Sequence, residues 1–294
     1  MTELLTLTGD QWAARPEPAM QARAANALEH GKVLVFPGLS FSLAGAGRSV
    51  LDPAIVKPGT KSVKYSPGKD AAWGMNPALG DEARDAVTEV LKRYAACARA
   101  LVDAYFPHYA AALETGNTSL RPVEAEGRIQ SRRHDDRLLH VDAFPSRPNY
   151  GQRLLRVFCN INPHGKPRTW KIGEPFAQVA GHFLPKLPRY NPLAAKVLQF
   201  AHVTKTLRSE YDHMMLKLHD RMKLDDAYQA EALQERVQFA PGTTWVVFSD
   251  QVSHAALAGQ HMLEQTFTLP VEAQAYPDAS PIRVLEGLAG RKLA

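Results

Sequence analysis

The sequence contains only two cysteines, Cys97 and Cys159, among its 294 residues. So few cysteines cannot build a disulfide framework or a zinc ribbon, and they fit a reducing compartment, so we expect a cytoplasmic protein. No apolar run approaches the eighteen or so residues that a membrane-spanning helix needs. The first ten residues have neither a basic start nor an apolar run ending in small residues, and we expect no signal peptide.

Several enzyme motifs are also missing. The absence of H-E-x-x-H argues against a zinc protease, and the absence of a P-loop and of a Rossmann glycine fingerprint argues against nucleotide chemistry. The motif E-x-x-H occurs once, at Glu210 and His213, whereas a carboxylate-bridged di-iron bundle needs it twice. We therefore interpret His213 and the nearby His219 as residues that pack or hydrogen-bond locally in their helix.

The hydrophobic pattern changes in blocks along the chain. Helical patterns end near Gly31 and near Phe106, a short buried strand lies at 32–36, strand patterns occupy 127–163 and resume at Val237, and helix-like segments lie between them. We predict one α+β domain over 1–294, with a mainly helical part at 1–126 and a barrel-like β core at 127–275. A helical insertion at about 174–233 interrupts this core, and 276–294 form a tail.

The most informative motif is His140-Val141-Asp142, where an apolar strand pattern begins. Alternation along a strand would place His140 and Asp142 on one face, and His254 follows a second strand-like run at 243–248. Two imidazoles and one carboxylate are the ligands of non-haem Fe(II) oxygenases. We predict that His140, Asp142 and His254 bind Fe(II) and form the catalytic centre; the alternative is that the two histidines are unrelated polar residues at strand ends.

An Fe(II) oxygenase commonly uses 2-oxoglutarate, whose distal carboxylate needs an Arg or Lys partner. In many such enzymes this cation lies about ten residues past the second histidine, but residues 263–267 contain none. The strand pattern at 153–162 places Arg156 and Asn160 on one face. We predict that Arg156 and Asn160 bind the co-substrate; in the alternative, Arg156 points into solvent.

Basic residues exceed acidic ones, with 35 Lys and Arg against 30 Asp and Glu. This excess indicates an acidic partner, which could be nucleic acid, an anionic membrane surface or a phosphorylated and carboxylated substrate. Several of the basic residues flank the metal motif. We expect contacts to an anionic substrate from these arginines: Arg128, Arg132, Arg133 and Arg147.

Longer motifs across the chain resemble the Fe(II)/2-oxoglutarate-dependent Kdo (3-deoxy-D-manno-oct-2-ulosonic acid) hydroxylases of Gram-negative bacteria. The similarity extends from Lys32-Val33-Leu34 to Leu285-Glu286. The motifs that carry it are Gly127-Arg128, Ser131, Asp135-Asp136-Arg137, Leu139 to Ser146, Leu155 to Pro163, Gly173 to Phe176, Tyr211-Asp212-His213, Leu218-His219-Asp220, His254-Ala255-Ala256 and Leu263 to Phe267.

The resemblance implies a double-stranded β-helix (jelly-roll) in which His140, Asp142 and His254 hold the iron. It further implies that 2-oxoglutarate and O₂ are converted to succinate and CO₂ while C3 of the terminal Kdo sugar of a Kdo-bearing lipid A is hydroxylated to Ko, at the cytoplasmic face of the inner membrane. Two alternatives stay open: a 2-oxoglutarate oxygenase of another substrate, and a non-catalytic metal-binding or nucleic-acid-binding barrel. The oligomeric state does not follow from the sequence.

Overall fold

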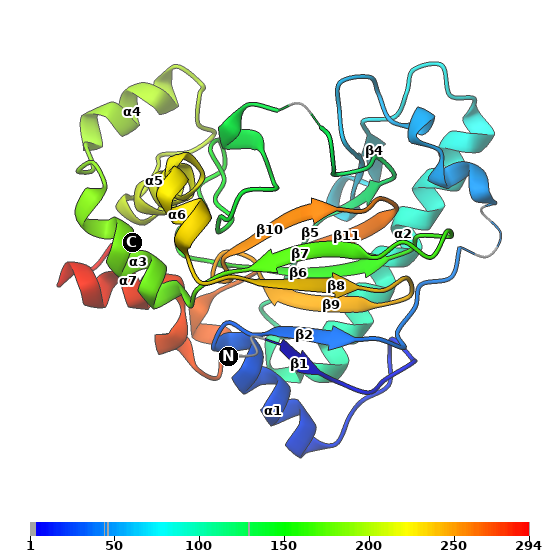
Figure 1. The fold of residues 1–294 in the computed structure, drawn as a ribbon, viewed down its shortest axis with the longest axis horizontal. Helices are drawn as coiled ribbons and strands as arrows, with labels where there is room; N and C mark the ends of the chain where they lie inside the picture. The colour runs from blue at the N-terminus through cyan, green and yellow to red at the C-terminus, as the bar shows by residue number, and fades with distance from the viewer. Residues whose placement is uncertain (1–3, 44, 46, 129, 294) are drawn as a thin grey trace.

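Two sheets face each other at the centre of the molecule (Figure 1). The computed structural model describes residues 4–43, 45, 47–128 and 130–293; Met1–Glu3, which carry part of the signal-peptide argument, lie outside it. The larger sheet has the order β1 (Leu4–Thr6), β2 (Val33–Phe36), β9 (Thr244–Phe248), β6 (Arg153–Asn160), β11 (Met262–Leu269), β5 (Glu114–Arg121), β3 (Val63–Ser66) and β4 (Ala71–Trp73). The smaller sheet has the order β10 (His254–Ala258), β7 (Arg168–Ile172) and β8 (Glu235–Phe239).

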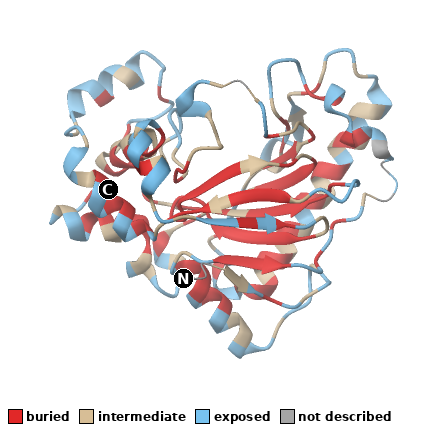
Figure 2. Cartoon of the chain, in the orientation of Figure 1, coloured by how far each residue is buried: buried red, intermediate tan, exposed pale blue. Residues whose placement is uncertain are grey.

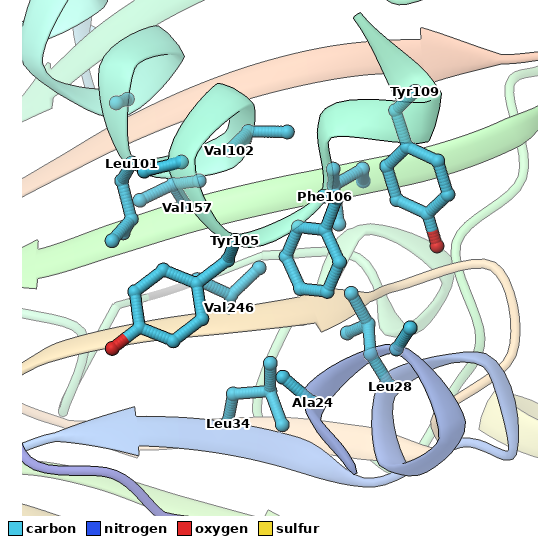
Figure 3. Packing of buried hydrophobic residues seen from close by; sticks show 14 of the residues in the cluster. Ala24, Leu28, Leu34, Leu101, Val102, Tyr105, Phe106, Tyr109, Val157 and Val246 are labelled. Carbon is cyan, nitrogen blue, oxygen red and sulfur yellow. The ribbon is translucent and has the colours of Figure 1, made fainter. Parts of the chain in front are cut away.

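Helices α1 (Pro18–Glu29) and α2 (Asp81–Tyr105) cover the outer face of the larger sheet (Figure 1). The central strand β6 alternates, so that Leu155 and Val157 point to these helices while Arg156 and Phe158 point between the sheets. Figure 3 shows Val157 and Val246 of the sheet packed with Phe106, the residue after α2, and with Leu28 of α1. The outer face is therefore a dry core, whereas polar side chains enter the space between the sheets.

A group of helices occupies one end of the sheets (Figure 1). It contains α3 (Phe176–Phe183), α4 (Pro192–Phe200), α5 (Glu210–Leu224) and α6 (Asp226–Glu231), together with α7 (Pro281–Ala289) from the tail. A separate buried cluster, which includes Phe183, Tyr211 and Leu285, joins α3, α5 and α7. Helix α5 begins with a capping box between Ser209 and Asp212, which satisfies backbone N–H groups of its first turn.

The predicted α+β class with a jelly-roll core is confirmed. The prediction for the first residues was wrong, because Leu4–Thr6 form strand β1, parallel to β2, instead of a helix. The strand expected around His140 is reduced to a single bridge between His140 and His254, and Asp142 follows in a loop. Among the described residues, no helix is both long and apolar enough to cross a membrane.

Candidate metal centre

Three side chains converge at the edge of the smaller sheet. His254 is the first residue of β10, and its backbone exchanges two hydrogen bonds with His140, N to O distances of 2.9 and 3.0 Å. The backbone N–H of Asp142 donates to the carbonyl of Ser249, which fixes the residue after this bridge. Ligand atoms of the three residues all lie within 4.8 Å of one another. The predicted triad is therefore assembled by main-chain pairing between two segments far apart in the sequence.

The two imidazoles are fixed in the same way. Nδ1 of His140 lies 2.7 Å from the carbonyl of Leu138, and Nδ1 of His254 lies 2.8 Å from the carbonyl of Val252. Because a carbonyl only accepts, each Nδ1 carries the hydrogen and each Nε2 keeps its lone pair. Burial lowers the pKa of both histidines, so both are neutral and able to bind a metal.

Asp142 completes a donor set that fits Fe(II). Burial raises its pKa, but the positive charge of Arg156 is the largest opposing cause and holds the pKa below its usual range, so the carboxylate is ionised. Arg156 Nη2 lies 3.0 Å from Asp142 Oδ2, in an ion pair without hydrogen-bond geometry, and this oxygen has no hydrogen-bond partner among the described residues. A buried ionised oxygen with a free lone pair beside two free imidazole nitrogens fits a divalent metal.

A cavity of about 150 Å³ adjoins the triad and lies between the two sheets. Its wall takes alternate residues from four strands: Arg156 and Phe158 from β6, Met262 and Glu264 from β11, Arg168 and Trp170 from β7, and His254 and Ala256 from β10. The i, i+2 spacing on every strand shows that the cavity is the inner face of the β-helix. Arg156 therefore points into the cavity, and the alternative that it points into solvent is wrong.

Arg156 does not have a free guanidinium. One arm pairs with Asp142, and another donates to Glu264, which also accepts from Arg121. Burial raises the pKa of Glu264, but the charges of Arg121 and Arg156 outweigh this effect, and the pKa lies below its usual range. Arg156 therefore holds the carboxylate of Asp142, and its Nε is the one guanidinium nitrogen without a partner among the described residues.

Arg168 is the better candidate to hold an anion. It is buried, its Nη1 donates to the carbonyl of Gly259 at 2.6 Å, and its Nε has no partner among the described residues. Burial, together with Arg121 and Arg128, lowers the pKa of Arg168 to about 9, and no carboxylate of the described chain reaches it within ion-pair distance. A buried cation in this state is unfavourable unless an anion binds beside it.

The position of Arg168 depends on Gly259. This glycine has φ +106°, and a Cβ there would lie 2.9 Å from the carbonyl oxygen of Pro167. Only glycine allows this approach, which brings the carbonyl of Gly259 to Arg168. Trp170, two residues further along β7, stacks on His254 with ring centroids 5.0 Å apart, and its buried Nε1 has no acceptor among the described residues.

The cavity wall carries an excess of positive charge. Four cations face three carboxylates: Lys61, Arg121, Arg156 and Arg168 against Asp136, Asp142 and Glu264. Asp136 is paired with Lys61 and lies near Arg121. A bound divalent metal would raise this excess to three, and a dianion would then offset two of these charges.

The other predicted site residues lie in different environments. Asn160 is buried, and its amide donates to the carbonyls of Lys166 and Phe239, so it supports the loop after β6 and does not line the cavity. Arg132 pairs with Asp226, the first residue of α6, and Arg133 lies 3.7 Å from Asp220 of α5. Arg128 is half-buried, and Arg147 is exposed on the loop after Asp142.

Sequence reasoning missed Arg121, Arg168, Trp170 and Glu264, which all line the cavity. The pattern Arg168-Thr169-Trp170 resembles the strand carrying Arg156, and an arginine in a strand was available as a signal. His219 was interpreted as a locally packed residue. Its Nδ1 does approach Asp220 at 3.2 Å, but its ring also lies against that of His140, 5.4 Å between centroids.

Comparisons with known proteins agree with this geometry. A family model described as 3-deoxy-D-manno-oct-2-ulosonic acid (Kdo) hydroxylase matches residues 11–292. A crystal structure of the Kdo hydroxylase KdoO, described as a non-heme Fe(II) alphaketoglutarate-dependent dioxygenase in complex with alphaketoglutarate and Fe(III), is 43% identical with a TM-score of 0.95. The complex of KdoO with cobalt(II) is 44% identical with a TM-score of 0.96.

Both alignments cover 99% of this chain and 97% of KdoO. No curated protein matches. The family match covers almost the whole chain, and the same residues that converge here supply the donor set such a dioxygenase needs. The chain belongs to the Kdo hydroxylase family of Fe(II)/2-oxoglutarate-dependent dioxygenases.

Proposed function

We propose that this protein hydroxylates C3 of the terminal Kdo sugar of a Kdo-bearing lipid A precursor, converting Kdo to Ko. The reaction uses Fe(II) and O₂, and 2-oxoglutarate is oxidised to succinate and CO₂. The observation that carries the proposal is the cavity between the sheets, where His140, Asp142 and His254 offer free donor atoms beside an excess of cations. This is the arrangement needed to hold a metal and a dianion together.

The residues that line the cavity have different proposed roles. His140, Asp142 and His254 would hold the iron, which when bound supplies the oxidising chemistry for O₂. Arg156 orients Asp142, and Glu264 in turn holds Arg156 and Arg121. Arg168 would receive the distal carboxylate of 2-oxoglutarate, supported by Arg121 and by the indole N–H of Trp170. This assignment replaces Asn160, whose amide is occupied by backbone carbonyls.

The substrate side is also basic. Kdo carries a carboxylate and lipid A carries phosphates, so arginines around the entrance would attract an anionic glycolipid. Arg147 is the strongest candidate, since it is exposed, follows Asp142 closely and has no ion-pair partner among the described residues. Arg128, Arg132 and Arg133 remain in the proposal, although Arg132 already pairs with Asp226. Such a substrate places the enzyme at the cytoplasmic face of the inner membrane.

The test reconstitutes the protein with Fe(II) without oxygen, then adds 2-oxoglutarate, O₂ and Kdo-bearing lipid A. Mass spectrometry should show one added oxygen on the Kdo unit with a matching amount of succinate. Succinate without the lipid product would leave a 2-oxoglutarate oxygenase of another substrate. If neither succinate nor the hydroxylated lipid forms, the result would favour the non-catalytic barrel. Alanine at Arg128, Arg132, Arg133 or Arg147 should raise the KM for the glycolipid, and unchanged kinetics in all four would refute the assigned substrate contacts.

A further inference from the structure

Helix α4 (Pro192–Phe200) presents an apolar face to solvent. Leu193, Val197 and Phe200 are 72%, 64% and 88% exposed. Their spacing of four and three residues places them within an arc of about 60° on one side of the helix. Ala195 is the one buried residue of this helix, and Figure 2 shows α4 exposed along most of its length. Large exposed apolar side chains that gather on one face mark an interaction surface.

The segment around this face has only positive charges. Residues 175–209 contain five Lys and Arg residues and no Asp or Glu. Lys186, Arg189, Lys196 and Lys205 are exposed, and none has an ion-pair partner among the described residues. Val203 and Leu207, 55% and 37% exposed, extend the apolar surface beyond the helix. An apolar face bordered by unpaired cations is complementary to the headgroup region of an anionic bilayer.

This surface is joined to the loop that follows the metal ligands. The guanidinium of Arg208 donates to the carbonyl of Pro145 at 2.6 Å, and the backbone N–H of Lys205 donates to Ser146 at 3.0 Å. Tyr150 then donates from its hydroxyl to the carbonyl of Leu207. The segment 201–209 and the loop 143–150 thus form one surface, which begins next to Asp142 and ends at α4.

We propose that α4 and residues 201–207 dock this protein on an anionic lipid bilayer, with Leu193, Val197 and Phe200 inserted among the headgroups and Lys196 and Lys205 at the lipid phosphates. The loop that follows Asp142, which is bonded to residues 205–208, is thereby held close to the membrane surface. This inference rests on the proposed function, because docking there serves an enzyme whose sugar substrate is anchored in the same bilayer.

The test is flotation of the purified protein with phosphatidylcholine vesicles that either contain or lack phosphatidylglycerol. We expect binding to the anionic vesicles only, weakened by salt. Combined Leu193→Ser, Val197→Ser and Phe200→Ser should lower the partition coefficient by about tenfold or more, and combined Lys196→Gln and Lys205→Gln by a similar factor. Leu233→Ser is the matched control, since Leu233 is 71% exposed outside this segment, and it should bind like the wild type.

Equal vesicle binding by the wild type and the triple serine variant would overturn the inference, and so would a wild type that does not bind. A concentration-dependent dimer that the triple variant abolishes would also overturn it, because the face would then contact a second copy. Vesicle binding needs no turnover, so it separates this inference from the proposed function. On a Kdo oligosaccharide without acyl chains the triple variant should keep wild-type kcat/KM, whereas on vesicle-embedded substrate its kcat/KM should fall.

Discussion

Arg168 provides the sharpest test of the co-substrate site. It is a buried cation whose Nε has no partner and whose pKa is lowered to about 9, so the folded protein without ligand carries an uncompensated charge. Binding of the distal carboxylate of 2-oxoglutarate would supply the missing anion. Replacing Arg168 by methionine, which keeps much of the apolar stem, should therefore weaken 2-oxoglutarate binding without disturbing the fold.

Removing one partner of a buried charge pair costs about 2–5 kcal/mol of binding free energy, and about 3 kcal/mol corresponds to roughly a 150-fold increase in Kd. The same change should leave the melting temperature of the ligand-free protein equal or higher, because it removes a buried charge that lacks a counterion. Weaker 2-oxoglutarate binding would thus come with an unchanged or higher melting temperature. A general loss of structure would lower both the affinity and the melting temperature.

The assay titrates 2-oxoglutarate into anaerobic Fe(II)-loaded protein and follows binding by calorimetry, with thermal unfolding measured in parallel. Arg153→Met is the matched control. Arg153 is also fully buried, but it donates to Asp250, Gln251 and Gln274. Its loss should lower the free energy of unfolding by about 3–5 kcal/mol. Wild-type affinity for 2-oxoglutarate in Arg168→Met would refute the assignment of Arg168.

Three further predictions concern the site and the core. His254→Ala should abolish Fe(II) binding and turnover together, whereas His261→Ala, a buried histidine outside the triad, should retain both; equilibrium dialysis with iron analysis measures this. The lowered pKa of Glu264 means that its ion pairs stabilise the fold above its unfolded pKa, about 4.3, and lose this effect as the pH falls through the lower folded pKa. The melting temperature should therefore drop between about pH 5 and pH 3, less steeply in Glu264→Gln, and equal slopes would contradict the argument. Burial raises the pKa of Cys159 to about 11, so iodoacetamide at about pH 8 should alkylate it only after unfolding, and rapid labelling of the native protein would contradict its burial.

The convergence of His140, Asp142 and His254 could be predicted from the sequence, because it depends on local alternation and on ligand chemistry. The side chains of His140 and Asp142 converge although the expected strand is only one bridge long, since the backbone there is bonded to His254 and Ser249. The family motifs then supplied the fold. What the sequence could not show is which strands become neighbours, because pairing of β7 with β10 joins residues more than eighty positions apart.

The prediction that Arg156 binds the co-substrate did not take the folded neighbours of this residue into account. Arg156 was correctly expected to sit on a strand face with Phe158, but its partners Asp142 and Glu264 come from a loop and from β11, and they leave little of its guanidinium free. A cation is available to a ligand only if its own chain leaves it unpaired, and pairing is a property of the folded state. Both arginines lie on strands that line the same cavity, and each leaves its Nε without a partner among the described residues, but only Arg156 is paired with carboxylates. The position of an arginine in a strand therefore predicts an anionic partner, and only the three-dimensional neighbours show whether that partner is a residue or a ligand.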